Sequence, residues 1–187
     1  MNKDKSEATV LKELSIAETF KVFVYLSSDK IEFSPSIIAG IISRESDWGL
    51  TLKPPGPSGT GDFGPRNKLK PFRTGLLPSD GGGFGRGLMQ IDYDAHEFAR
   101  GKDWPDAKLN IGYGCQVLRA SFRIMRMKLG LNHKSILSGA IAGYNCGPMI
   151  AVRSIQSGLG ADGYTTGKDY SEDVLFRSEV FKSNGWV

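Results

Sequence analysis

The sequence predicts a mainly α-helical domain of the α+β type, with a long central helix and a small irregular β and loop insert. Isoleucines repeat at helical spacing over 34–47, and a longer apolar stripe repeats over 106–129. Between these two stripes, residues 50–88 contain so many prolines and glycines that regular elements cannot persist there. With 187 residues, 40% of them hydrophobic, the chain can form one domain, 1–187, around a sizeable core.

The N-terminal part of the chain predicts two helices. Apolar residues at helical spacing predict a packing helix over 7–28, within an N-terminal segment 1–30. Ser34 and Pro35 then begin the isoleucine helix, because a serine oxygen can cap the first turn and proline loses no hydrogen bond there. We expect this helix over about 34–47, with its end near Gly49.

A Gly/Pro-rich insert follows over 50–91, where short extended pieces are expected around Arg66–Phe72 and Gly87–Asp92. A long loop inside a compact domain is usually functional or mobile. Helices resume afterwards. We expect a short helix over 92–100, the long central helix over 106–129, and further helices over 133–145 (capped by Asn132), 148–157 and 168–184.

Composition and motifs narrow the function classes. The net charge of +4 comes without a dense Lys/Arg run, which argues against a nucleic-acid partner. No apolar stretch is long enough to span a membrane. His96-Glu97 begins a zinc-helix pattern, but no second histidine follows at metal-ligand spacing, so no metal and no cofactor are expected. We expect a monomer.

The sequence leaves open whether the two cysteines form a bridge and where the chain is located. Cys115 lies on the stripe of the long helix and is most simply a small buried hydrophobe, but Cys115 and Cys146 could form one bridge at most. The polar start of the sequence lacks an apolar signal region, so the chain is cytosolic, exported by another route, or a mature or excised domain.

Glu45 is the most conspicuous candidate residue, because it lies on the same helical face as Ile38, Ile41 and Ile42. An unpaired carboxylate is costly to bury, and a carboxyl kept protonated near neutral pH can act as a general acid. The alternative is an ordinary helix end with Arg44 and Glu45 in solvent. The helical phase argues against that alternative for Glu45, but not for Arg44.

Two further motifs follow Ser43-Arg44-Glu45-Ser46. Gly85-Arg86-Gly87-Leu88-Met89-Gln90-Ile91-Asp92 is not a dinucleotide loop, which needs a strand before it and a helix directly after it. It is either a tight turn into a strand or a backbone segment that glycine brings close to a ligand. In Ala142–Pro148, Gly147 and Pro148 end a helix, and Tyr144-Asn145 either belongs to the core or faces a groove.

In this order the three motifs resemble the goose-type lysozyme family and, more distantly, the lytic transglycosylases that share its fold. The resemblance covers about residues 34–180 and implies a lysozyme-like fold in which the insert flanks a cleft. It implies that Glu45 protonates the glycosidic oxygen and that Asp92 helps to position water. It further implies that the substrate contacts His96, Gln90, Tyr144 and Asn145, and that Tyr170 points back at the catalytic centre.

The insert departs from the family pattern. The family carries a second aspartate between the glutamate and Gly-Leu-Met-Gln, in a much shorter loop. Here the loop is expanded, so Asp62 and Asp80 compete for that position and spacing alone does not choose between them. The other reading of either residue is a turn aspartate, because aspartate favours turns next to glycine.

The resemblance implies a muramidase that cleaves β-1,4 bonds between N-acetylmuramic acid and N-acetylglucosamine in peptidoglycan, with inversion. Its partners would be peptidoglycan and N-acetylglucosamine oligosaccharides, and it would act extracellularly. An inverting enzyme needs its two carboxyls roughly 6.5–9.5 Å apart to admit a water molecule. One alternative is a lytic transglycosylase that forms 1,6-anhydro products, and another is a non-catalytic module that binds cell walls or chitooligosaccharides.

Overall fold

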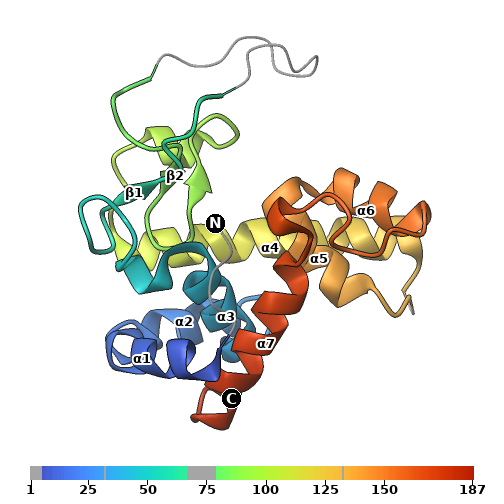
Figure 1. Cartoon of the computed structure of the whole chain (residues 1–187), viewed down its shortest axis with the longest axis horizontal. Coiled ribbons are helices and arrows are strands. Elements are labelled where there is room, and N and C mark those ends of the chain that lie inside the picture. Colours follow the sequence, from blue (N-terminus) through green and yellow to red (C-terminus); the bar gives the residue numbers. More distant parts are fainter. Residues whose placement is uncertain (1–5, 32, 67–78, 132) are drawn as a thin grey trace.

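The computed structural model describes residues 6–31, 33–66, 79–131 and 133–187, and it confirms a mainly α-helical fold with a small sheet (Figure 1). The helices in the described ranges are α1 (Glu7–Glu18), α2 (Lys21–Ser28), α3 (Pro35–Ser46), α4 (Ala107–Leu129), α5 (Ile136–Cys146), α6 (Pro148–Gln156) and α7 (Tyr170–Ser183). Short 3-10 turns lie at Asp47–Gly49, Glu97–Arg100 and Thr166–Lys168.

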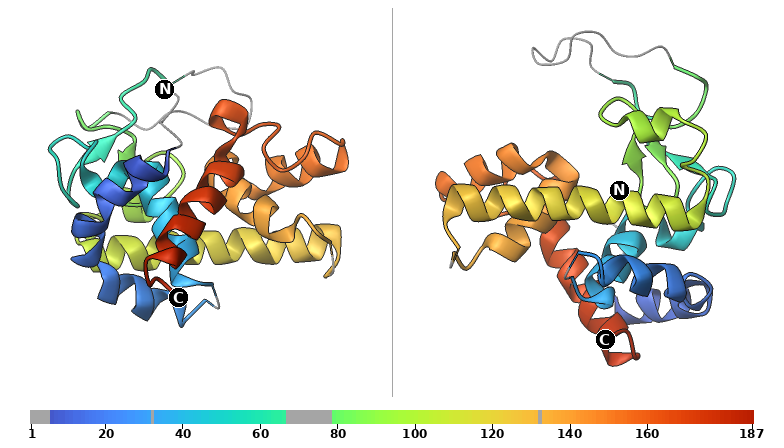
Figure 2. Two further views of the ribbon diagram at one scale, coloured as in Figure 1. Left: turned by 60° about the horizontal axis from the view of Figure 1, so that its bottom comes forward. Right: turned by 180° about the vertical axis from the view of Figure 1, so that it is seen from behind.

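The long helix α4 runs through the whole molecule (Figures 1 and 2). The sheet, α1 and α2 lie towards its N-terminal half, while α5 and α6 pack along its C-terminal half. Helix α7 then returns across the middle and packs against α3. Four residues of the predicted central stripe, Ile111, Cys115, Leu118 and Met125, are at most 1% exposed, and Phe122 and Leu129 are partly buried.

The predicted helix over 7–28 is wrong in one respect, because it is two helices. Phe20 leaves helical backbone geometry (φ −108°, ψ −1°), and α2 begins one residue later. The Phe20 ring stacks on Trp48 with centroids 6.1 Å apart, and Trp48 is completely buried. The break therefore coincides with packing against this tryptophan, a tertiary contact that a helical pattern alone cannot reveal.

The predicted helix over 92–100 is also wrong, since only the 3-10 turn Glu97–Arg100 forms there. The Asp92 carboxylate accepts hydrogen bonds from the backbone N–H groups of Asp94 (2.8 Å) and Ala95 (2.9 Å). Such a side-chain turn competes with helix formation. Helices α5 and α7 begin two or three residues later than expected, and the proposed cap Asn132 lies outside the described residues.

The small sheet consists of β1 (Thr60–Gly61), β2 (Gly85–Arg86) and β3 (Ile91–Asp92), paired antiparallel in the order β1-β2-β3. Thr60 pairs with Arg86, and Gly85 pairs with Asp92. The extended piece expected around Arg66–Phe72 falls, apart from Arg66, outside the described residues. The sheet brings the two ends of the insert together beside the C-terminal end of α3.

Helices α3 and α7 approach each other closely at Gly40. A Cβ atom at this position would lie 2.6 Å from the carbonyl oxygen of Val174 and 3.1 Å from the backbone nitrogen of Ser178. Only glycine fits so close to a neighbouring backbone. This contact brings Glu45, near the end of α3, towards Tyr170, at the start of α7.

Candidate active site

A cleft of about 900 Å³ lies between the sheet and the helices α5, α6 and α7. The sheet side contributes Asp62, Arg66, Gln90 and Asp92, and the helical side contributes Tyr144, Asn145 and Thr166. Glu45, Tyr170 and His96 also line it. The structure therefore brings together eight of the nine candidate residues predicted from the sequence, and Asp80 is the exception.

The side chains of Ser43-Arg44-Glu45-Ser46 point to three parts of the fold: helix α7, the cleft and the turn before β3. The Ser43 hydroxyl accepts a hydrogen bond from Arg177 (2.7 Å), and the Ser46 hydroxyl donates one to the carbonyl of Leu88 (2.7 Å). Arg44 turns towards α7, and Glu45 faces the cleft. The end of α3 is therefore attached both to α7 and to the turn that precedes β3.

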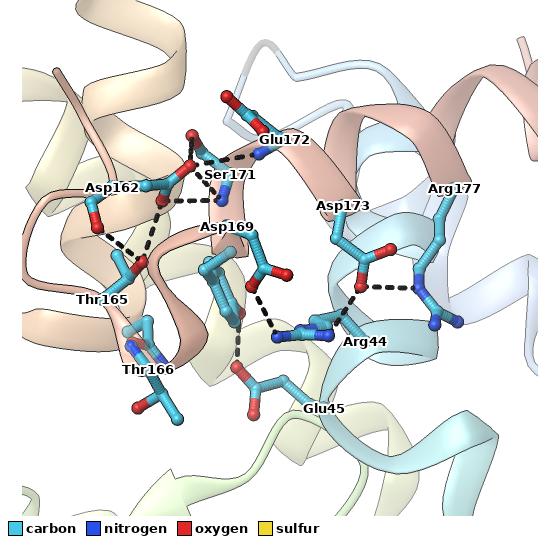
Figure 3. Close-up of polar contacts among 12 residues, drawn as sticks. Arg44, Glu45, Asp162, Thr165, Thr166, Asp169, Ser171, Glu172, Asp173 and Arg177 are labelled. Carbon is cyan, nitrogen blue, oxygen red and sulfur yellow. Dashed lines mark hydrogen bonds and ion pairs between the residues drawn. The ribbon is translucent and has the colours of Figure 1, made fainter. Parts of the chain in front are cut away.

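The carboxyl of Glu45 meets the hydroxyl of Tyr170, which donates a short hydrogen bond to Oε1 (Figure 3). The hydroxyl of Tyr144 donates instead to the carbonyl of Met89 (2.7 Å). Burial, followed by the negative charge of Glu45, raises the pKa of both tyrosines well above the usual value near 10. Both phenols are therefore uncharged at neutral pH, and Tyr170 remains a hydrogen-bond donor to Glu45.

A buried ionic network connects α3 and α7 next to the Glu45–Tyr170 pair (Figure 3). Arg44 forms ion pairs with Asp173 (2.8 Å) and Asp169 (3.2 Å), and Arg177 pairs with Asp173 (3.2 Å) and Glu13 (3.3 Å). The Arg44 side chain is only 10% exposed, so the reading that left it in solvent is wrong. Removing one partner of such a buried pair leaves a charge uncompensated.

The first turn of α7 is held by a residue from outside the helix. The carboxylate of Asp162 accepts hydrogen bonds from the backbone N–H of Ser171 (2.9 Å), from its hydroxyl (2.6 Å) and from the hydroxyl of Thr165 (3.1 Å) (Figure 3). A carboxylate at a helix N-terminus satisfies free N–H groups and interacts favourably with the helix dipole. Asp162 thereby fixes the position of Tyr170, the residue before Ser171.

On the sheet side, one arginine joins two of the predicted aspartates. Arg66 contacts Asp62 (2.7 Å) and Asp92 (2.8 Å) through its two terminal nitrogens, and Asp94 lies 4.0 Å away. Its guanidinium carbon also lies 4.1 Å from the centroid of the Phe84 ring. Asp62 directly follows β1, and Asp92 is the last residue of β3. The sheet and Arg66 therefore hold both carboxylates in the cleft that Glu45 also lines.

Asp80 has a different environment. Its carboxylate forms an ion pair with Arg86 (2.7 Å) and accepts a hydrogen bond from the backbone N–H of Gly82 (3.0 Å). The bond from Arg86 lowers the pKa of Asp80 below its usual value. Asp80 does not line the cleft, and these contacts are those of a turn residue that supports the insert.

The side chain of Gln90 occupies a space beside two glycines of the sheet, Gly61 and Gly85. Its backbone has φ +47°, an uncommon value for a residue other than glycine, and its side-chain amide donates to the carbonyl of Gly87 (2.8 Å). A Cβ atom at Gly85 would lie 2.1 Å from Gln90 Oε1, and one at Gly61 would lie 2.3 Å from it. The glycines of β1 and β2 thus leave the space that the Gln90 side chain occupies.

His96 and Asn145 complete the predicted set. The Nδ1 atom of His96 lies 3.1 Å from the hydroxyl of Tyr113. Burial lowers the pKa of His96 below 6.5, so the imidazole is neutral at pH 7. The side-chain oxygen of Asn145 accepts a hydrogen bond from the backbone N–H of Thr166 (2.9 Å), which connects the end of α5 to the loop before α7.

Cys115 and Cys146 are both free thiols. Burial raises their pKa to about 12 and about 11, respectively.

Within the described ranges, no three residues of the types His, Cys, Asp and Glu gather as metal ligands. In the same ranges, no helix combines the length and the apolar character that are needed to cross a membrane.

Three structural residues of the site were not predicted from the sequence: Arg66, Asp162 and Asn110. Asn110 is fully buried on α4, accepts a hydrogen bond from the backbone N–H of Met89 (2.9 Å) and donates one to the carbonyl of Arg86 (3.0 Å). Its polar side chain near the start of an apolar helix could have drawn attention to it. Arg66 and Asp162 lie in loops, where no periodicity marks them.

Carboxyl groups brought together in one cleft from a helix and a sheet are the arrangement with which glycoside hydrolases work. The family model "Lysozyme g" matches residues 74–185 of this chain. Relatives named lysozyme g include those of Takifugu rubripes (31% identical, over 89% of this chain and 76% of the relative) and Struthio camelus (28%, over 94% and 72%). That of Epinephelus coioides is 33% identical over 82% of this chain and 70% of the relative. The chain belongs to the lysozyme g family of peptidoglycan-hydrolysing glycoside hydrolases.

Proposed function

We propose that Glu45 is the general acid of this muramidase, and that it protonates the oxygen of the β-1,4 bond between N-acetylmuramic acid and N-acetylglucosamine. The observation that carries the proposal is the position of Glu45, at the end of an apolar helix face and in contact with Tyr170 inside the cleft. A neutral phenol stabilises the carboxylate that forms once the proton has left, because it donates a hydrogen bond to it.

Asp62 and Asp92 position the attacking water in this proposal. Two carboxylates that share one guanidinium are held at a fixed separation, and Arg66 offsets their mutual repulsion. Their free lone pairs can orient a water molecule on the face of the sugar opposite the acid, which is what inversion requires. Gln90, His96, Tyr144 and Asn145 are the proposed sugar contacts, since they line the same cleft.

The other enzymatic candidate is a lytic transglycosylase. It would use the same acid but let the muramic acid hydroxyl attack in place of water. The Asp62–Arg66–Asp92 cluster favours hydrolysis, because an intramolecular attack needs no carboxylates to position water. A non-catalytic wall-binding module would need neither the cluster nor a Tyr170 hydroxyl directed at Glu45.

Product analysis of digested peptidoglycan tests this function. Purified walls are digested in water enriched in ¹⁸O, the fragments are weighed by mass spectrometry, and the anomer released first is identified by NMR. We expect hydrated reducing ends that carry one ¹⁸O atom and appear first as the α anomer. Anhydro ends without ¹⁸O would overturn hydrolysis, and an initial β anomer would overturn inversion.

The substrate also indicates where the protein acts and which partners it has. Its substrate is a wall polymer, so we propose that it acts outside the cell as a monomer, with no nucleic-acid or membrane partner. A net charge of +4 suits encounter with an anionic wall.

A further inference from the structure

A second hollow of about 900 Å³ lies between α2 and α4, and it shares no lining residue with the catalytic cleft. Its apolar part includes Phe23, Leu26, Phe98 and Leu109. Leu26 and Leu109 are 48% and 46% exposed, respectively. We call this hollow the α2–α4 groove. The mechanism proposed above makes no use of it.

Four cationic side chains line the α2–α4 groove, namely Lys30, Lys108, Arg119 and Arg123, against the single carboxylate of Asp103. Across the parts of the chain that the structure describes, none of the four lies within 4.0 Å of a carboxylate oxygen. The arginines of the catalytic cleft, by contrast, are all engaged in ion pairs. Among the described residues, the groove therefore presents four cationic side chains without an ion-pair partner.

The spacing of these cations excludes a compact ligand. Lys108 and Arg123 are fifteen residues apart on one helix, which corresponds to about 22 Å along its axis. A single phosphate or carboxylate cannot contact both, whereas an extended chain with several anionic groups can. The exposed Leu26 and Leu109 line the same groove together with the partly buried Phe23 and Phe98, and they add a requirement for apolar groups on the same chain.

We propose that the α2–α4 groove binds the carboxylate-bearing peptide stems of peptidoglycan, as a second contact of the enzyme with its polymeric substrate. Such stems combine carboxylates with alkyl side chains along one chain, as the groove requires. This inference rests on the proposed function, because it takes the wall as the substrate. The groove also adjoins the cleft, since Tyr113 lines the groove while its hydroxyl contacts His96 of the cleft.

The test compares two pairs of substitutions on the same helix. Arg119→Gln with Arg123→Gln removes two charges from the groove. Arg126→Gln with Lys128→Gln removes two charges from the last turn of α4, outside the groove. Both variants are assayed on purified walls extracted to remove phosphate-containing polymers. Binding of the neutral N-acetylglucosamine hexamer is measured by calorimetry, and melting temperatures establish that the variants fold.

We expect the groove variant to lyse walls roughly fivefold more slowly at low ionic strength, with the difference shrinking as salt is added. Its affinity for the neutral hexamer should equal that of the wild type, and the control pair should stay within about twofold on walls. Equal losses in both variants would overturn the proposal, because only bulk charge would then matter. A groove effect that appears only on unextracted walls would also overturn it, because the ligand would then be a phosphate polymer.

Glu45→Gln separates this inference from the proposed function. If Glu45 is the acid, that substitution lowers the lysis rate at least about a hundredfold, while wall binding through the groove persists in a sedimentation assay. Normal lysis by Glu45→Gln would contradict the proposed function and leave the comparison of the two charge variants intact.

Discussion

Tyr170 and Glu45 are 125 residues apart in the chain, yet their side chains share a hydrogen bond in the wall of the cleft. The bond depends on two supports. Arg44 fixes the end of α3 through Asp169 and Asp173, and Asp162 fixes the first turn of α7 through Ser171. Glu45, the proposed acid, and its hydrogen-bond donor Tyr170 are thus positioned by residues that need not touch the sugar.

Replacing Tyr170 by Phe removes the donor to Glu45 and keeps the ring. A hydrogen bond to a charged group contributes about 1.5–3 kcal/mol, so we expect kcat to fall roughly tenfold to a hundredfold with little change in KM. Steady-state kinetics on purified walls checks this. Tyr25→Phe is the matched control, because its hydroxyl also bonds to one acceptor, the carbonyl of Gly185 (3.2 Å), far from the cleft. Equal kcat in wild type and Tyr170→Phe would contradict the role of the phenol.

A second experiment at this scale distinguishes the roles of the three candidate aspartates, Asp62, Asp80 and Asp92. Asp62→Asn and Asp92→Asn each disturb the pair bridged by Arg66, and each should lower kcat by roughly 10²-fold or more, the low end for a base that activates water. Asp80→Asn removes a similar ion pair outside the cleft and should leave kcat within about twofold. A large loss in Asp80→Asn, with Asp62→Asn fully active, would reverse our assignment.

At the scale of elements, the fold depends on how closely α3 and α7 pack. Gly40→Ser should destabilise the protein by about 1–3 kcal/mol, since its Cβ would meet the Val174 carbonyl at 2.6 Å. The control is Gly112→Ala on α4, where the nearest atom lies 4.0 Å from an added Cβ. We expect Gly112→Ala to raise the free energy of unfolding by about 0.5–1 kcal/mol. Urea unfolding measures both, and a neutral Gly40→Ser would show that the two helices can separate at little cost.

Helical periodicity predicted most of the elements, because amphipathic stripes such as that of α4 reflect burial directly. The pattern failed where a tertiary contact or a side-chain turn overrides it. Phe20 breaks the first helix to pack on Trp48, and Asp92 forms a turn where a helix was expected. For the site, motif order was enough to find residues that share the cleft. Our preference for Asp62 over Asp80 rests on the structure, because their spacing in the sequence does not show which one lines the cleft and contacts Arg66.

At the scale of the whole molecule, hydrophobic packing and buried ion pairs hold the fold without a disulfide, because both cysteines are free thiols. With pKa values of about 12 for Cys115 and about 11 for Cys146, almost no thiolate is present at pH 8. We expect alkylation by iodoacetamide to be slow in the native state and complete after unfolding, as followed by mass spectrometry. A melting temperature that drops on addition of dithiothreitol would contradict this account.

The central claim is that Glu45 delivers the proton, and the lysis rate of purified walls by Glu45→Gln tests it most directly. Glutamine keeps the size of the side chain and an acceptor for the Tyr170 hydroxyl, so the variant should fold and melt like the wild type. We predict a loss of lysis of roughly 10²- to 10⁴-fold at every pH, with wall binding retained. A folded Glu45→Gln protein that lyses walls at a rate close to that of the wild type would contradict the account.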